Sequence, residues 1–322
     1  MTAEKKRPTL SVILPHYNHE KLLPRALDSY LNQSVQADEI LVMDDCSTDG
    51  SIAIIEEYAR KYPSVRLYQA PKNVGNIVNG NLGLEMVEGD FIYWAASDDF
   101  VHPGFFEKSL DLLAEHPDAR ISCTVGDWRD EKSGLITHIG TKMGDRPSYL
   151  SPVDVEELEK AGRLQIPSNT ILWHRQTLLE LGGLDSELKW HCDWFLYTMM
   201  ALRYGVCFVP EALAVFFMHP AGLSARTPEK EAAHQVVLKN ILEALESERF
   251  ADLKRPICDS GALYIFGSPM RRLISGDRRF QEYLTPLYLR KSRWHSFKTW
   301  LKPLMPRWIS ELILRMIGAK SG

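Results

Sequence analysis

The sequence lacks the features that mark secreted, membrane-spanning and dinucleotide-binding proteins. The N-terminus has no apolar run like that of a signal peptide, and no stretch approaches the roughly 18 apolar residues of a membrane span. Neither G-x-G-x-x-G nor G-x-x-x-x-G-K-[ST] occurs, which disfavours a dinucleotide-binding fold and a P-loop. The chain has five cysteines: Cys46, Cys123, Cys192, Cys207 and Cys258. Because they are odd in number and form no C-x-x-C pair, we expect reduced thiols in a cytoplasmic protein.

What the chain contains is ordinary for a globular protein. Its 322 residues are 45% hydrophobic and 25% charged, enough for a large core in one main domain with an appendage. The net charge of −4 conceals an uneven distribution. Residues 270–322 hold 12 Lys and Arg against 3 Asp and Glu, whereas the preceding residues hold 26 against 39.

Four strand-like runs end in polar clusters within the first hundred residues, and they begin at Leu10, Glu39, Val65 and Gly89. Between the first two runs, apolar residues recur at helical spacing, and the same pattern follows Gly50. Alternating strands and helices predict an open, mostly parallel sheet whose carboxyl edge forms a ligand crevice. The chain is therefore predicted to be an α/β protein.

The fourth run is followed by two adjacent carboxylates, Asp98 and Asp99. Like charges this close disfavour joint ionisation unless a cation neutralises them. Oxygen ligands that leave most coordination positions open are typical of Mg²⁺ or Mn²⁺ bridging substrate phosphates. An acidic turn that caps the next helix is the alternative for such a pair.

Several short segments, in this order along the chain, resemble one known family. They are Val12–Asn18, Asp44–Gly50, Asn73–Gly75, Asn81–Leu84, Ser97–Asp99, Gly182–Asp185, His191–Trp194 and Met218–Pro220. The first five look like the nucleotide-sugar half of the family 2 glycosyltransferases with the GT-A fold, and the match covers roughly residues 8–225. The resemblance implies a Rossmann-like, mostly parallel sheet flanked by helices, with a helical C-terminal appendage.

The same resemblance implies the function and the domain boundaries. We expect a metal-dependent, inverting transfer of a sugar from a nucleotide donor, UDP-linked by preference, to a hydroxyl acceptor in the assembly of cell-surface polysaccharide or glycolipid. The catalytic domain would span residues 1–228, with the nucleotide-sugar half at 8–100 and the acceptor half at 101–228. A helical basic region would follow at 229–322.

The resemblance places seven residues at the nucleotide: Pro15, Tyr17, Asn18, Asp45, Asn73, Asn76 and Asp98. The ring of Tyr17 would stack on the base, because an aromatic face binds any base in this way. Asp45 resembles the carboxylate that accepts a hydrogen bond from uracil. Asn73 and Asn76 either reach the uracil or ribose or stabilise the turn around Gly75, and both readings remain open.

The expected metal ligands are Asp99, Asp98 and His219, with Mn²⁺ or Mg²⁺ as the cofactor. The family pattern is Asp-x-Asp, and Ala96 stands where its first Asp is common. His219 follows an apolar strand at a place where relatives often carry a histidine near the diphosphate or the metal. A neutral imidazole is a competent ligand, and a protonated one would pair with phosphate.

Asp193 is the expected general base, because the family has an Asp before an aromatic residue at this point. A carboxylate at a helix N-terminus is also favoured by the helix dipole, so capping is the alternative. Trp190, His191 and Trp194 are expected to line the acceptor, since aromatic walls are common in sugar sites. Cys192 stands where relatives more often have an acidic residue.

Two other functions compete with this one. A sugar nucleotidyltransferase would need a glycine-rich, basic loop after the first strand, and Pro15–Asn18 is not such a loop. A degenerate transferase domain that only binds nucleotide or serves as a scaffold is favoured by Ala96 and Cys192. No Gln-x-x-Arg-Trp motif occurs at the expected place, which favours transfer of a single sugar over processive synthesis.

The basic C-terminal region interleaves its cations with large apolar side chains, among them Trp300, Trp308 and Ile313. Such a segment suits the interface of an anionic membrane, near a lipid-linked saccharide acceptor. Packing on the catalytic domain or on a partner subunit is the equal alternative. Nucleic acid is disfavoured as a partner, because the acidic body of the chain would repel it. Residues 229–249 are predicted to form an amphipathic helix that joins the core to this region.

Overall fold

The computed structural model describes residues 7–130, 134–218 and 228–301. The chain divides into two compact units, one of residues 1–155 and 164–225 and the other of residues 156–163 and 226–322. Trp308, Ile313 and His219 lie outside the described residues, as does the side chain of Trp300.

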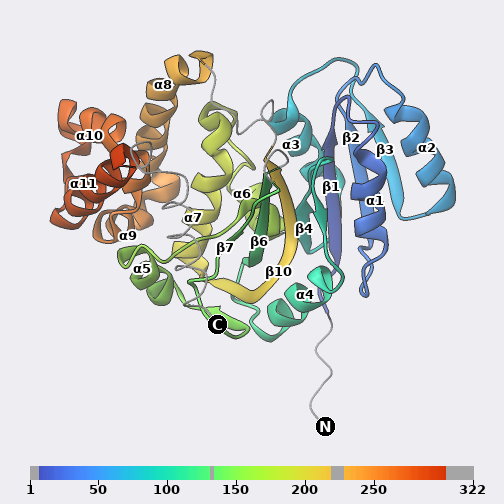
Figure 1. Ribbon diagram of the computed structural model, residues 1–322, viewed down its shortest axis with the longest axis horizontal. Coiled ribbons are helices and arrows are strands. Elements are labelled where there is room, and N and C mark those ends of the chain that lie inside the picture. The colour runs from blue at the N-terminus through green and yellow to red at the C-terminus, as the bar shows by residue number, and fades with distance from the viewer. Residues whose placement is uncertain (1–6, 131–133, 219–227, 302–322) are drawn as a thin grey trace, which may run out of the picture. The chain divides into compact units, whose positions relative to one another are not determined.

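Every strand among the described residues lies in the first unit, whose sheet Figure 1 shows. The strands are β1 Leu10–His16, β2 Glu39–Asp44, β3 Val65–Gln69, β4 Phe91–Trp94, β5 Phe100–Val101, β6 Ile121–Asp130, β7 Ile136–Ile139, β8 Ser148–Leu150, β9 Leu172–His174 and β10 Val206–Met218. Its α-helices are α1 Leu23–Leu31, α2 Ser51–Lys61, α3 Asn76–Met86, α4 Phe105–Glu115, α6 Arg175–Glu180 and α7 Cys192–Tyr204. Two 3₁₀ helices are η1 Ser168–Thr170 and η2 Ser186–His191, and α5, Pro152–Lys160, runs from this unit into the second.

One sheet runs in the order β3-β2-β1-β4-β9-β6-β10-β5, with β7 beside β6 and β8 beside β10. The strands β3, β2, β1 and β4 are parallel to one another and lie side by side in Figure 1. β10 is parallel to β6, whereas β9, β5, β7 and β8 join antiparallel. The predicted α/β fold with parallel strands at its nucleotide half is confirmed, and the antiparallel strands are additions that the sequence patterns do not indicate.

Both faces of β1 are covered, because side chains alternate along a strand. Val12 packs in a cluster with Leu27 and Tyr30 of α1, whose apolar residues recur at i, i+3, i+4 and i+7. Towards α3, a Cβ added at Gly83 would come within 2.8 Å of the Ile13 side chain. Glycine at this position therefore lets α3 lie close against β1, which sets the position of the helix N-terminus at the carboxyl edge of the sheet.

The second unit is helical, as predicted for the C-terminal region. Its elements are α8 Pro228–Leu245, η3 Glu248–Leu253, α9 Lys254–Ser260, η4 Ala262–Phe266, α10 Gly267–Gly276, η5 Arg278–Tyr283 and α11 Pro286–Leu301. Its core includes Leu238, Ile241, Ile257 and Met270. α8 ends at Leu245, and the chain turns before η3. The helix therefore ends before residue 249, where the sequence predicted its end. Among the described residues, no helix is both long and apolar enough to cross a membrane.

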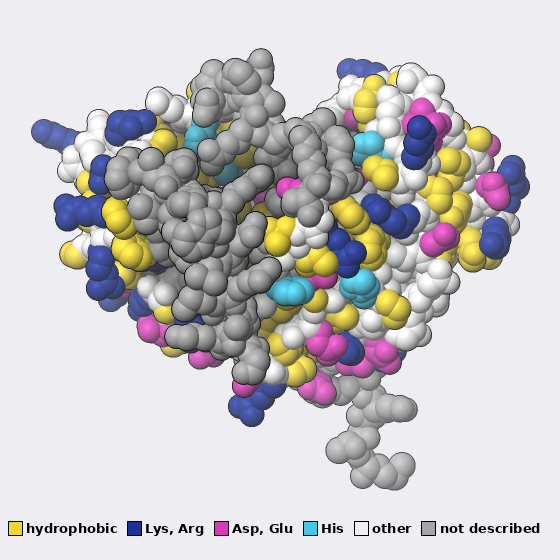
Figure 2. Space-filling model, viewed as in Figure 1, with side chains coloured by type: hydrophobic (Ala, Val, Ile, Leu, Met, Phe, Trp, Pro, Cys, Tyr) yellow, Lys and Arg dark blue, Asp and Glu magenta, His cyan; other side chains and the backbone are white. Residues whose placement is uncertain are grey.

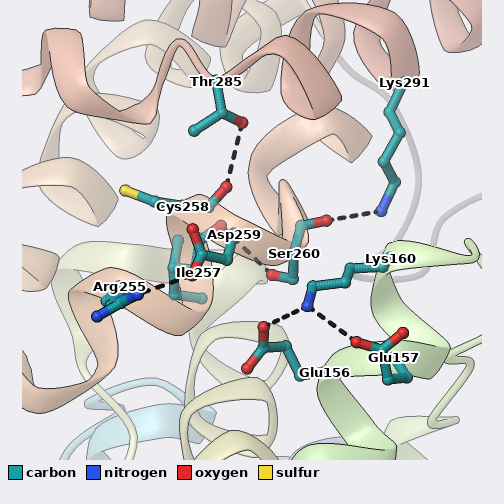
Figure 3. Close-up of polar contacts among 10 residues, drawn as sticks. All are labelled: Glu156, Glu157, Lys160, Arg255, Ile257, Cys258, Asp259, Ser260, Thr285 and Lys291. Carbon is teal, nitrogen blue, oxygen red and sulfur yellow. Dashed lines mark hydrogen bonds and ion pairs between the residues drawn. The ribbon is translucent and has the colours of Figure 1, made fainter.

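Residues 156–163 belong to the second unit, and Lys291 of α11 connects them with α9; Figure 3 shows its contact with Ser260. Lys291 Nζ lies 3.1 Å from Glu159 Oε1 and donates to the carbonyl of Ser260 at 3.1 Å. Burial raises the pKa of Glu159 to about 7 and lowers the pKa of Lys291, because these side chains are only 11% and 10% exposed. The pair therefore attaches a segment from the middle of the chain to α9 and α11.

Candidate active site

The carboxyl ends of β1 and β2 are joined by their loops. Asn18 adopts a left-handed conformation, φ 52°, and its side-chain oxygen accepts a hydrogen bond from the Thr48 backbone N–H at 2.8 Å. Its own N–H donates to the Ser47 hydroxyl at 3.0 Å. Tyr17, the residue before Asn18, is 45% exposed, so its ring is accessible for stacking. Pro15 lies in β1 opposite Met43 and is half-buried.

The Asp45 carboxylate holds the loop that precedes α3. Its two oxygens accept hydrogen bonds from the backbone N–H groups of Val74 and Gly75, each at 2.8 Å. The Asn73 amide donates to the carbonyl of Asp45 at 3.1 Å, and Gly75 has φ 87°, where a side chain would be strained. Asp45 and Asn73 therefore stabilise the loop before α3, while their contact with uracil stays a prediction. Asn76 is exposed at the first residue of α3.

The structure adds His16, which the sequence motifs do not single out. Its ring is 2% exposed, and neither nitrogen has a hydrogen-bond partner. Burial lowers the pKa of His16 to about 4, so the imidazole is neutral at physiological pH. Asp44, the last residue of β2, and Asn79, in α3, each keep one buried side-chain oxygen without a partner. Buried polar atoms of this kind are normally satisfied by water or ligand, so they belong with the candidate site.

Asp99 is a buried carboxylate whose charged form is electrostatically unfavourable. It is 2% exposed, and burial, together with the adjacent Asp98 carboxylate, raises its pKa well above the usual range. The Phe217 backbone N–H donates to it at 3.2 Å, and the side chain of Asn169 lies beside it and opposes the shift. A divalent cation would remove the cost of ionising both carboxylates.

Asp98 and Asp99 fit Mg²⁺ or Mn²⁺, because such ions bind through one or two carboxylates together with substrate phosphates. No group of three or more His, Cys, Asp or Glu side chains suited to a metal occurs in the described part of the chain. His219, the third predicted ligand, lies outside those residues. The two aspartates are therefore the described residues that would hold the ion.

Asp193 lies in the first turn of α7, as the sequence predicts. Its Oδ1 accepts a hydrogen bond from the Trp194 N–H at 2.6 Å, and the side chain of Ser168 also hydrogen-bonds to it. Burial outweighs these bonds and raises the pKa of Asp193. A carboxylate with a raised pKa is a stronger base than a free one, which suits proton removal.

A three-residue helix, η1, brings the two predicted carboxylates together. Ser168 bonds to Asp193, and the next residue, Asn169, lies beside Asp99. The Asn169 carbonyl is held in turn by the Tyr93 hydroxyl at 3.1 Å. No motif marks this segment in the sequence, so neither residue is predicted there.

Of the predicted acceptor residues, Trp190 and His191 lie directly before α7, and Trp194 lies in its first turn. Trp190 donates from its indole N–H to His191 Nε2 at 3.0 Å, and their rings meet edge to face with centroids 5.9 Å apart. Lys189 has a left-handed φ of 47°, which turns the chain ahead of these rings. Asp185 accepts a hydrogen bond from the Glu187 N–H at 2.9 Å and therefore caps η2, in the manner of a turn residue.

Comparison with known proteins gives consistent matches. The sequence profile described as "Glycosyl transferase family 2" matches residues 11–166. The minor teichoic acid biosynthesis protein GgaB of Bacillus subtilis is 39% identical over 108 residues, which cover 33% of this chain and 12% of that protein. The uncharacterized protein MT1568 of Mycobacterium tuberculosis is 30% identical over 217 residues, 65% of this chain and 67% of that protein.

Among solved structures, S. aureus TarS 1–349 in complex with UDP-GlcNAc has a TM-score of 0.64 at 18% identity. The match covers 88% of this chain and 79% of that one, and at this identity it shows a shared fold. This chain spans only part of the length of these curated relatives. It covers 44% of an uncharacterized glycosyltransferase of Haemophilus influenzae that is 40% identical, and 12% of GgaB.

Proposed function

We infer that this chain, which belongs to glycosyl transferase family 2, transfers a sugar from a nucleotide donor to a hydroxyl acceptor. One observation carries this function. The short helix η1 contacts both Asp99, the buried carboxylate proposed to bind the metal, and Asp193, a carboxylate whose pKa is raised. UDP is the proposed nucleotide, supported by the UDP-GlcNAc complex of the TarS fold relative. Assembly of a cell-surface polymer or glycolipid is the proposed context, supported by the name of the GgaB relative.

The proposed reaction is a direct displacement. The Asp193 carboxylate takes the proton of the acceptor hydroxyl while the hydroxyl oxygen forms a bond to the anomeric carbon of the donor. The bond from that carbon to the donor phosphate breaks, and the nucleoside diphosphate leaves with the electron pair. A single displacement inverts the anomeric configuration. Asp98 and Asp99 would hold a divalent ion, which would supply Lewis-acid stabilisation of the leaving diphosphate.

Nucleotide binding is tested with two variants at the edge of the sheet. Tyr17→Ala removes the proposed stacking ring, and Asp45→Asn removes the carboxylate charge while keeping an acceptor for the loop. Each should weaken UDP binding by roughly 1–3 kcal/mol in calorimetry, because one stacking contact or one charged hydrogen bond is lost. Tyr62→Ala is a matched control, since Tyr62 is half-buried before β3, at the opposite edge of the sheet. Unchanged UDP affinity in both site variants would place the nucleoside elsewhere.

The degenerate-domain alternative predicts UDP binding without turnover. Hydrolysis of a panel of nucleotide sugars separates it from an active transferase, since many donors release free sugar slowly when water replaces the acceptor. A nucleotidyltransferase would instead release pyrophosphate from a nucleoside triphosphate and a sugar phosphate.

We also propose that the basic C-terminal region binds an anionic membrane surface. Its described part supports this, because α11 exposes Trp294 and Phe297, whose rings stack with centroids 5.8 Å apart. Arg290 and Arg293 are exposed on the same helix. Cations with interfacial aromatic rings suit anionic lipid headgroups.

Vesicle flotation tests the membrane proposal. The protein should float with anionic liposomes, less with neutral ones, and high salt should release only part of it, because charge attraction is screened whereas inserted rings are not. Arg293→Gln should reduce flotation, with a loss of about 1 kcal/mol per well-placed cation. Arg255→Gln is the control, since Arg255 is exposed in the same unit but lies on α9, before the cation-rich residues 270–322. A wild-type protein that never floats contradicts the proposal.

A further inference from the structure

Register places side chains of three strands on one face of the sheet. Val215 of β10 pairs with Phe100 of β5 on one side and with Asp127 of β6 on the other. Two residues further along, Phe217 pairs with Arg129. Because paired residues share a face and alternate residues along a strand return to it, Phe100, Phe217, Asp127 and Arg129 point to the same side.

Two guanidinium groups pack against the aromatic rings of this face. Arg25 of α1 lies 4.3 Å from the centroid of Phe217 and 5.3 Å from that of Phe100. Arg129 lies 5.7 Å from the centroid of Phe100. We call Arg25, Phe100, Arg129 and Phe217 the arginine–aromatic cluster. Figure 2 shows Lys or Arg, His and hydrophobic side chains next to one another where Figure 1 draws β10 and the lower part of α1.

Carboxylates among the described residues leave N–H groups of Arg25 and Arg129 available for further hydrogen bonds. Arg25 forms no ion pair there, and it donates to the backbone carbonyl of Asp98. Arg129 forms a long ion pair with Asp127 at 3.7 Å, while the other oxygen of Asp127 lies 2.6 Å from His138 Nδ1. The buried Nε–H of Arg129 has no hydrogen-bond partner. A stacked guanidinium with unused N–H groups is suited to bind phosphate or carboxylate.

The cluster is adjacent to the proposed reaction centre, and three of its residues, Phe100, Arg129 and Phe217, lie on strands at the other end of the sheet from β1, β2 and β3. Arg25 contacts the Asp98 backbone, and the Phe217 N–H donates to Asp99. Tyr17, Asp45 and most of the other proposed nucleotide residues lie at or after β1, β2 and β3, at one end of the strand order, and Asp98 follows β4, whereas β6, β10 and β5 form the other end. An anion held by the cluster would therefore approach the donor from the acceptor side.

We propose that the arginine–aromatic cluster binds an anionic group of the acceptor, so that the acceptor is a saccharide or polymer carrying phosphate or carboxylate. This inference rests on the proposed function. The two arginines supply the charge-assisted hydrogen bonds, and Phe100 and Phe217 hold their planes in place. The cluster thereby selects charged over neutral acceptors.

The test uses the full-length chain saturated with UDP and Mn²⁺, titrated calorimetrically with glucose 6-phosphate, glucuronate and glucose. At least one charged sugar should bind about tenfold or more tightly than glucose, and the preference should fall with added salt. Comparison of the two charged sugars distinguishes phosphate from carboxylate. Arg129→Gln and Arg25→Gln should each remove about tenfold of this affinity while leaving UDP affinity unchanged. Arg60→Gln, a change of an exposed arginine on α2, should have no effect.

The outcomes separate this inference from the function on which it rests. Charged sugars that bind no better than glucose, in a chain that binds UDP, overturn the inference alone. An equal loss in Arg60→Gln also overturns it, because the effect would then be one of net charge. Weaker UDP binding in Arg129→Gln assigns the cluster to the donor instead. A wild-type chain that binds no UDP overturns the proposed function and this inference together. Arg25 is exposed on its helix, so Arg25→Gln keeps the test valid if Arg129→Gln fails to fold.

Discussion

Replacing Asp193 with asparagine should lower turnover by about 10²–10⁴-fold, the usual contribution of a positioned general base. Asparagine keeps the size of the side chain and an acceptor for the Trp194 N–H, but it takes no proton from the acceptor hydroxyl. Donor affinity should be nearly preserved, because Asp193 acts on the acceptor. Turnover and UDP affinity of the same preparation are the two measurements. Asp185→Asn is the control, since Asp185 caps η2 and should be replaceable with little loss of turnover.

The pH profile gives Asp193 a second readout. Burial raises the pKa of Asp193 above that of a free carboxyl, which is about 4. The Asp193 carboxyl therefore stays protonated, and inactive as a base, up to a higher pH. Turnover should rise with pH through this raised pKa, and the limb should disappear in Asp193→Asn. A folded-state pKa above the unfolded value costs stability at higher pH, so the neutral variant should melt no earlier than wild type at pH 8. Near-normal turnover with an unchanged limb would assign the base to another carboxylate.

Removal of divalent metal should abolish transfer, and Mn²⁺ or Mg²⁺ should restore it. The physical reason is the buried Asp99 beside Asp98, whose joint ionisation is unfavourable without a cation. Asp99→Asn should leave the fold intact and remove the Mn²⁺-dependent part of UDP affinity, measured by calorimetry with and without the ion. Asp111→Asn, at an exposed carboxylate that pairs with Arg7, is the matched control. Full activity in the presence of EDTA would contradict this prediction.

Local patterns predicted the nucleotide half of the fold well. The strands that begin at Leu10 and Glu39 are found there, because short apolar runs between polar loops have few alternatives to a buried strand. Asp193 was predicted at a helix start, and it lies in the first turn of α7. The weaker part was the segment between residues 127 and 190, which carries no specific motif. Its strands β7, β8 and β9 are short and join antiparallel, and β8 and β9 pair with strands far away in the chain, so their sequence alone does not indicate them.

The sequence by itself determined the family, the order of strands and helices in the nucleotide half, and the chemical types of the candidate site residues. These follow from hydrophobic periodicity and short motifs, which act over a few neighbouring residues. Only the tertiary structure decided that η1 brings Ser168 to Asp193 and Asn169 beside Asp99, and that Arg25 packs on Phe217. Contacts between residues far apart in the chain depend on strand register and packing. The same is true of His16, whose lowered pKa arises from burial among groups that the sequence keeps apart.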